Sequence, residues 1–251
     1  MIALSHRLDQ GGPMLHLKEI RISSDEFPTR EYYPFNLGVL QQTETIPFSS
    51  SVTFLIGENG SGKSTLLEAL THRCGIYIWS GEQRTRCEVN PYEDKLFLYL
   101  KVEWTDGIVP GSFFSSQIFR NFAQIVDEWE ADNPGQIDYF GGKSLLTQSH
   151  GQSLMSFFKA RYKIKGLYLL DEPETALSPR SQLEFLRLLQ ETGQRGQAQF
   201  IIATHSPILL ACPGSMIYSF DHVPLRVVRY EETPHYQIYK NFMEDPEKFL
   251  K

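Results

Sequence analysis

The sequence predicts an α/β fold, with a parallel core sheet, an antiparallel β layer beside it and a helical lid. Three short apolar runs without alternation are typical of parallel strands buried on both faces, and they lie at residues 52–56, 167–170 and 200–203. Residues 95–104 instead alternate between apolar and polar side chains, which predicts a strand of an antiparallel layer. Apolar side chains recur at helical spacing between residues 118 and 129. We therefore expect a helical lid at about residues 112–165.

The composition is that of an ordinary globular protein, with 251 residues, 41% hydrophobic and 22% charged. Residues 1–13 are polar and lack the apolar core of a signal peptide, so we expect a loose leader followed by a single domain at residues 14–251. The formal net charge of −6 argues against a surface that coats nucleic acid, although a local basic face stays possible.

The three cysteines, Cys74, Cys87 and Cys212, form no C-x-x-C pair. This scattered, odd set fits the reduced thiols of a cytosol and not a disulfide framework or a zinc site. No apolar stretch reaches the length of about 18 residues that a transmembrane helix needs. We therefore expect a cytoplasmic protein without an integral membrane segment.

The first apolar run leads directly into a phosphate-binding motif. Residues 57–64 fit the pattern G-x-x-x-x-G-K-[ST], and the good helix formers 65–70 follow them. Glycines let backbone N–H groups approach phosphate oxygens, and the positive end of the helix points at the same place. Lys63 is expected to reach the β- and γ-phosphates of ATP, and Ser64 to place its hydroxyl on Mg²⁺. The predicted nucleotide-binding residues here are Gly57, Glu58, Asn59, Gly60, Ser61, Gly62, Lys63, Ser64 and Thr65.

The other two apolar runs also end in polar residues, at the edge where open α/β sheets bind ligands. Asp171 can hold Mg²⁺, and the adjacent Glu172 can orient or deprotonate a water molecule for attack on the γ-phosphate. An acidic turn after a strand is the alternative interpretation of this pair. His205 follows the third run, and a neutral imidazole there can bind the γ-phosphate, although a histidine at a strand end is more often structural.

Three aromatic residues, Tyr32, Tyr33 and Phe35, lie about two dozen residues before the phosphate-binding loop. One of them could stack on the adenine ring. Packing of the loop on the sheet is at least as good an interpretation, since aromatic side chains more often serve packing.

Beyond the leader, the chain resembles the ABC-type ATPases, in particular the stand-alone bacterial "AAA family ATPase" kind that is related to the RecF and SMC proteins. In this resemblance residues 57–64 match the Walker A motif and residues 167–172 match Walker B. Glu172 then corresponds to the catalytic glutamate, residues 175–178 to the D-loop and His205 to the switch histidine. The fold that the resemblance implies is the ABC-ATPase variant of the P-loop NTPases.

Two further site elements rest on the resemblance alone. Residues 149–152, Ser149-His150-Gly151-Gln152, resemble the signature sequence LSGGQ, with Gln148 in place of its leucine and His150 in place of a glycine. The resemblance implies that Ser149, Gly151 and Gln152 contact the nucleotide. It also implies that Gln117 is the Q-loop glutamine, which would join Ser64 and Asp171 at the metal.

The resemblance implies hydrolysis of ATP to ADP and phosphate by a homodimer that holds ATP between its subunits. ATP would act as a switch on an unidentified partner in DNA repair, chromosome maintenance or phage defence. A nucleotide-binding subunit of a membrane transporter is the main alternative, and the divergent signature argues against it. A nucleotide sensor that does not hydrolyse ATP is the other alternative. Binding of nucleic acid is possible on this basis and is not implied.

Overall fold

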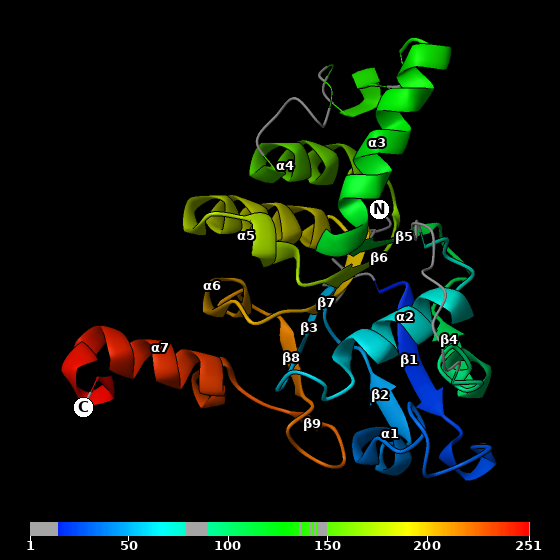
Figure 1. Ribbon diagram of the computed structural model, residues 1–251, viewed down its shortest axis with the longest axis vertical. Coiled ribbons are helices and arrows are strands. Elements are labelled where there is room, and N and C mark those ends of the chain that lie inside the picture. Colours follow the sequence, from blue (N-terminus) through cyan, green and yellow to red (C-terminus); the bar gives the residue numbers. More distant parts are fainter. Residues whose placement is uncertain are drawn as a thin grey trace, which may run out of the picture.

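A six-stranded sheet forms the centre of the computed structural model, which describes residues 15–78, 90–135, 137–140, 142, 144 and 150–250 (Figure 1). Its strand order is β5-β6-β7-β3-β8-β9, with parallel pairing except between β8 and β9. The strands are β3 (Val52–Ile56), β5 (Gly111–Ser115), β6 (Gly166–Asp171), β7 (Ala198–Ala203), β8 (Met216–Ser219) and β9 (Arg226–Val227). The three apolar runs of the sequence are thus the central strands β6, β7 and β3, and the predicted α/β class is confirmed.

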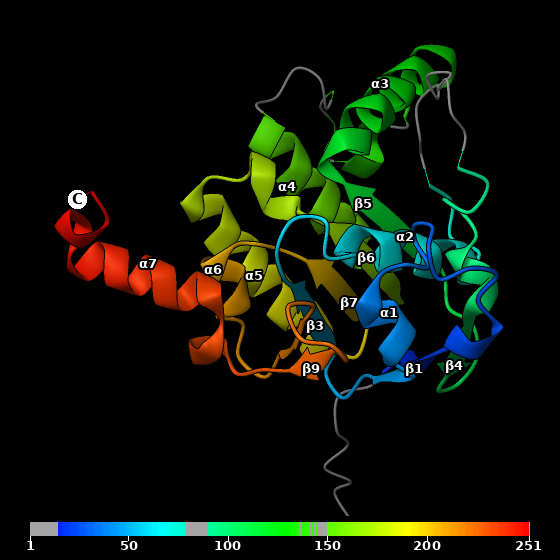
Figure 2. The same cartoon turned by 60° about the horizontal axis from the view of Figure 1, so that its bottom comes forward.

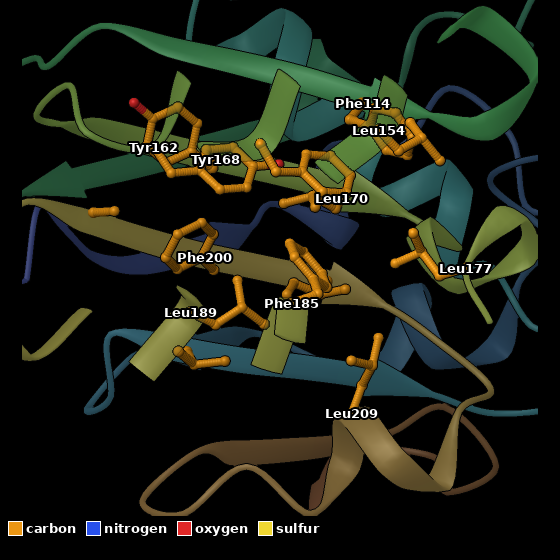
Figure 3. Close-up of a cluster of buried hydrophobic side chains, with 14 of the residues drawn as sticks. Phe114, Leu154, Tyr162, Tyr168, Leu170, Leu177, Phe185, Leu189, Phe200 and Leu209 are labelled. Atoms are coloured by element: carbon orange, nitrogen blue, oxygen red, sulfur yellow. The ribbon is translucent and has the colours of Figure 1, made fainter. Parts of the chain in front are cut away.

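Helices cover one face of this sheet. They are α3 (Ser116–Asp132), α4 (His150–Arg161), α5 (Pro179–Gln194) and the short α6 (Pro207–Leu210). Alternate residues of the buried strands face them, so that Tyr168 and Phe200 meet Tyr162, just after α4, and Phe185 of α5 lies beside them (Figure 3). The ring centroids of Tyr162 and Tyr168 are 4.6 Å apart, and those of Tyr162 and Phe200 are 5.0 Å apart. This aromatic cluster buries the helical layer against the sheet.

The other face of the sheet packs against helix α2 (Lys63–Arg73) and a second, antiparallel sheet. That sheet has the order β2-β1-β4, formed by β2 (Thr45–Pro47), β1 (Leu17–Ile22) and β4 (Leu100–Trp104). Helix α1 (Gly38–Gln42) lies at its edge, and α2 lies between the two sheets (Figure 2). The predicted antiparallel layer is therefore present. It forms a second hydrophobic core, on the face of the six-stranded sheet opposite the helices α3, α4, α5 and α6.

One buried side chain joins the two sheets. Oε1 of Gln199, on β7, accepts hydrogen bonds from the backbone N–H groups of His16 (2.8 Å) and Leu17 (2.7 Å). Nε2 of Gln199 donates to the backbone carbonyl of Leu17 at 2.9 Å. Gln199 is fully buried, so all of these bonds form away from solvent.

Replacing Gln199 with leucine should destabilise the protein strongly. The substitution introduces an apolar side chain of similar size. It leaves two backbone donors and one backbone acceptor buried without the partners that Gln199 supplies. Each such group costs about 1–3 kcal/mol, so we expect the free energy of unfolding to fall by on the order of 3 kcal/mol or more. Urea denaturation measures this, with Gln194→Leu, at an exposed position of α5, as the control. Equal stability of the two variants would contradict the bridging role.

The structure corrects two expectations about element boundaries. Residues 111–115 form β5, the edge strand of the core sheet, so the lid begins at Ser116 and not at residue 112. Only the second half of residues 95–104 is a strand, because Leu96–Tyr99 is a turn of 3-10 helix. The last helix of the chain is α7 (Pro234–Glu244).

Short 3-10 turns complete the described elements, at Ser24–Glu26, Leu96–Tyr99, Ile137–Phe140, Pro173–Ala176, Tyr230–Glu232 and Pro246–Phe249. None of the helices in the described ranges is both long and apolar enough to cross a membrane. The expected leader at residues 1–13 lies outside the described residues.

Candidate active site

The strand register brings the predicted site residues to one edge of the core sheet. Asp171 at the end of β6 pairs with Ser115 of β5 on one side and with Ala203 of β7 on the other. Ala203 pairs in turn with Leu55 of β3, next to the residue that precedes the phosphate-binding loop. Because these strands are parallel, the segments that follow them leave the sheet at the same edge. Glu172, His205 and the loop at residues 57–64 therefore converge.

The phosphate-binding loop has the backbone that its glycines predict. Gly57 and Gly62 have φ angles of 146° and 105°, values that L-residues rarely adopt. A Cβ atom at Gly62 would lie 2.9 Å from Cδ1 of Leu37, so the side chain of Leu37 would have to shift to admit one. Gly62 is the N-cap of α2, and the free N–H groups of the first turn of α2 are directed to the loop. The loop can thus bind an anion through its backbone.

The side chain of Lys63 lies inside this loop. Its Nζ donates hydrogen bonds to the backbone carbonyls of Gly57 at 2.6 Å and Glu58 at 3.0 Å. Burial lowers the pKa of Lys63, and the nearby carboxylates of Glu172 and Asp171 oppose that shift. The ammonium group is therefore held where phosphate oxygens could replace the carbonyls as its acceptors.

Ser64 and Asp171 form the oxygen pair that a magnesium ion needs. The hydroxyl of Ser64 donates to Oδ1 of Asp171 at 3.1 Å, which joins the start of α2 to the end of β6. Burial raises the pKa of Asp171, and the hydrogen bond from Ser64 opposes this shift. Mg²⁺ typically takes one or two protein oxygens and completes its octahedron with water and phosphate. The residues present therefore fit a Mg²⁺ ion that binds together with a nucleotide.

Glu172 and His205 face each other across the same edge. Glu172 has a φ of 46°, a left-handed conformation that few non-glycine residues adopt. Oε1 of Glu172 lies 3.7 Å from Nε2 of His205. Burial, followed by the charge of Lys63, lowers the pKa of His205, so the imidazole is neutral at pH 7. Nε2 of His205 has no hydrogen-bond partner among the described residues.

Three polar residues that sequence reasoning missed complete this edge. Asp221, just beyond β8, accepts a hydrogen bond at 2.9 Å from the N–H of Glu58 in the loop. Glu174 accepts one at 2.7 Å from the N–H of His205, and burial raises the pKa of this carboxyl group. Nε2 of His235 lies 3.0 Å from Nδ1 of His205. The residues Thr233-Pro234 are a helix-start signal that could have pointed to a helix here.

Of the three aromatic residues considered for adenine stacking, the structure removes one. Phe35 is fully buried and packs against Phe27 and Tyr99, so its ring is not available to a ligand. Tyr33 is 40% exposed, and its hydroxyl lies 2.7 Å from Oγ1 of Thr65, the residue after the phosphate-binding motif. Tyr33 therefore stands at the nucleotide side of the loop, which keeps it a candidate.

The remaining predicted residues stay predictions. Gln117 is the second residue of α3, two positions after the residue that pairs with Asp171, and its side chain lies outside the described part. Ser149 also lies outside it, and so does the side chain of His150, the first residue of α4. Gly151 follows in the same turn, where a Cβ atom would lie 3.0 Å from the carbonyl oxygen of Ala176.

Gln152 is exposed on the same turn of α4. Gly151 thus lies against the turn that follows Glu172, on a different element from the phosphate-binding loop.

The loop, the helix start and the carboxylates at one sheet edge define a P-loop nucleotide-binding protein. Two AAA-domain family models match the chain. One, described as "AAA domain, putative AbiEii toxin, Type IV TA system", matches residues 146–211. The other, described as "AAA domain", matches residues 35–75.

Known proteins similar to this chain include two ATP-binding proteins that are named for import or transport. The thiamine import ATP-binding protein ThiQ of Ruegeria sp. (strain TM1040) is 27% identical over 214 residues, which cover 77% of this chain and 82% of that protein. The energy-coupling factor transporter ATP-binding protein EcfA2 of Lactococcus lactis subsp. cremoris (strain MG1363) is 26% identical over 62% of this chain and 59% of its own length.

Among solved structures, the ADP conformation of MJ1267, an ATP-binding cassette of an ABC transporter, superposes with a TM-score of 0.52. Its sequence is 14% identical, over 93% of this chain and 96% of that one. This likeness shows the fold. The chain thus has the P-loop NTPase fold of the ABC-ATPase kind that the sequence predicted, and it matches AAA-domain models over two parts of its length.

Proposed function

We propose that this protein binds ATP with Mg²⁺ and hydrolyses it to ADP and phosphate, and that ATP-bound copies pair as a homodimer. The observation that carries the proposal is the convergence of Lys63, the Ser64–Asp171 pair, Glu172 and His205 at one edge of the sheet. These are the charges and donors that phosphoryl transfer to water requires.

Each residue has a separate task in this proposal. Ser64 and Asp171 would hold Mg²⁺, which neutralises phosphate charge when it is bound. Lys63 would exchange its carbonyl acceptors for β- and γ-phosphate oxygens. Glu172 would accept a proton from the attacking water, through the carboxylate that lies beside His205. Neutral His205 would donate a hydrogen bond to the γ-phosphate through Nε2.

The resemblance of residues 149–152 to the signature sequence supports the homodimer. Gly151 and Gln152 belong to the first turn of α4, whereas Lys63 and Ser64 start α2. A second copy would supply its signature segment to the nucleotide on the phosphate-binding loop of the first. ATP would then belong to the interface and act as a switch for a partner protein. The toxin–antitoxin description of the matching family model supports a role in defence, next to DNA repair and chromosome maintenance.

A transporter subunit is the second candidate function. The printed names of the similar proteins ThiQ and EcfA2 are those of transporter ATP-binding proteins, and this favours it. The divergence of residues 148–152 from LSGGQ argues against it. A partner in the membrane would distinguish this candidate from a switch that acts on another protein.

Phosphate release by the purified protein tests the activity. We expect release of phosphate from ATP, and we expect it to stop when a chelator removes Mg²⁺. The reason is that the charge of the metal, which Ser64 and Asp171 would hold, is needed to neutralise the triphosphate. A protein that binds ATP and releases no phosphate would instead be a nucleotide sensor that does not hydrolyse ATP. A pull-down from the native host, with and without ATP, identifies the partner, and co-purification with an integral membrane protein would favour the transporter.

A further inference from the structure

The ring of His205 has two different neighbours, one at each nitrogen. Nε2 faces Oε1 of Glu172 at 3.7 Å, on the side of the proposed γ-phosphate. Nδ1 lies 3.0 Å from Nε2 of His235, the second residue of α7. Helix α7 extends away from the rest of the molecule (Figure 2). Its N-terminal half reaches the nucleotide edge, where it lines a pocket together with Gly57, Glu58 and His205. His235 therefore brings a distant part of the chain to the site.

A chain of hydrogen bonds fixes the start of α7 against the segment that carries His205. The hydroxyl of Tyr230 donates to the carbonyl of Pro207 at 3.0 Å, two residues beyond His205. Thr233 donates through Oγ1 to the carbonyl of Tyr230 at 2.7 Å, and the same oxygen accepts from the N–H of Tyr236 at 3.2 Å as the N-cap of α7. These hydrogen bonds join the segment that carries His235 to the segment that carries His205, and they thereby fix the position of one ring relative to the other.

The surroundings of the two rings select one arrangement of their protons. In a neutral imidazole one nitrogen carries hydrogen and the other accepts. An unprotonated Nε2 on His205 would direct its lone pair at the carboxylate of Glu172, and the two would repel each other. A protonated Nε2 is instead attracted to that carboxylate. Nδ1 of His205 must then be the acceptor, and Nε2–H of His235 the donor. Each arrangement leaves one buried N–H without a hydrogen-bond partner among the described residues, either Nε2–H of His205 or Nδ1–H of His235. Only Nε2–H of His205 is known to face a carboxylate, that of Glu172, so the first arrangement is favoured.

We infer that His235 is a positioning residue for the ATP site, which holds His205 in the Nε2–H tautomer by donating a hydrogen bond to Nδ1. Only that tautomer can donate from Nε2 to a γ-phosphate oxygen. His235 acts on hydrolysis through His205 and has no contact of its own with the reacting atoms. The expected effect on the rate of hydrolysis rests on the proposed function. The assignment of the tautomer does not, because it rests only on the contacts of the two rings.

Three variants separate hydrogen bonding from packing. His235→Phe keeps a planar ring and removes the donor, so we expect kcat to fall about tenfold with little change in KM for ATP. His235→Gln keeps an N–H donor on a flexible side chain and should restore most of kcat. Tyr236→Phe, which removes a hydroxyl from the next residue of α7 and keeps its ring, is the matched control and should match wild type.

The ¹⁵N signals of the histidine rings, recorded without nucleotide, test the tautomer directly. We expect a protonated Nε2 and a bare Nδ1 for His205 in the wild type and in His235→Gln, and a mixture of both tautomers in His235→Phe. A protonated Nδ1 in the wild type, or unchanged ring signals and kcat in His235→Phe, would overturn the inference. A wild-type protein that releases no phosphate would contradict the proposed function instead, and the ring signals would still decide the tautomer.

Discussion

Replacing Glu172 with glutamine is expected to lower the rate of ATP hydrolysis by a factor on the order of a hundred or more. The substitution keeps the size of the side chain and removes the base, and loss of a general base typically has this scale. Asp171, Ser64 and Lys63 are unchanged, so ATP and Mg²⁺ should still bind. Phosphate release and equilibrium binding of a labelled ATP analogue measure the two effects separately. A variant that hydrolyses ATP at the wild-type rate would remove Glu172 from the mechanism.

The same variant should accumulate as a dimer in the presence of ATP and Mg²⁺. A ligand stabilises the state to which it binds best, and unhydrolysed ATP would persist at the interface. Ser149→Arg in the Glu172→Gln background should abolish the dimer, since it places bulk and charge at the proposed contact. Light scattering after size exclusion compares the wild type with both variants. A Glu172→Gln protein that binds ATP and stays monomeric at high concentration would contradict the dimer mechanism.

Replacing Lys63 with alanine should weaken ATP binding by roughly one to two orders of magnitude. A hydrogen bond to a charged group contributes about 1.5–3 kcal/mol, and 1.4 kcal/mol corresponds to a factor of ten in affinity. Lys63 is buried, and its ammonium group is the cation held inside the loop by Gly57 and Glu58. Calorimetric titration with a non-hydrolysable ATP analogue measures the loss.

Two controls accompany the Lys63 variant. Lys101→Ala removes an exposed lysine from the antiparallel sheet and should bind the analogue like the wild type. A melting curve without nucleotide checks that Lys63→Ala is folded. Wild-type affinity in a folded Lys63→Ala protein would show that the loop does not bind the triphosphate.

The central strands and the phosphate-binding loop were predictable because each signal is local. Strands β3, β6 and β7 are buried on both faces, so their sequences are continuous apolar runs, and the motif directly follows the first of them. Ser178 and Pro179 are a local helix-start signal of the same kind, because Ser178 is the N-cap of α5, with an oxygen that accepts from the N–H of Ser181.

Other elements were not predictable because their signals are weak or depend on distant residues. Strand β5 is an edge strand whose sequence, Gly-Ser-Phe-Phe-Ser, has two apolar residues and no alternation, so it was assigned to the lid. Leu96–Tyr99 continues the alternation of β4, yet its backbone turns into a 3-10 helix over α2. Tertiary packing overrides local preference in both places.

The site shows the same division. Lys63, Ser64, Asp171, Glu172 and His205 follow buried strands or belong to a motif, and the sequence marked them. Asp221, Glu174 and His235 reach the same edge only through contacts made by the folded chain. Phe35 is likewise buried by contacts with Phe27 and Tyr99, two residues that lie far from each other in the sequence.

The Gln199 bridge has a mechanical consequence. The two sheets are joined by hydrogen bonds that break only if His16 and Leu17 separate from β7, so the sheets should move as one rigid body when nucleotide binds or leaves. The connection from α4 to β6 is tied down as well, because the hydroxyl of Tyr168 donates to the carbonyls of Arg161 and Ile164. The phosphate-binding loop, which follows β3 of the core sheet, should therefore keep its position relative to the antiparallel sheet in both states.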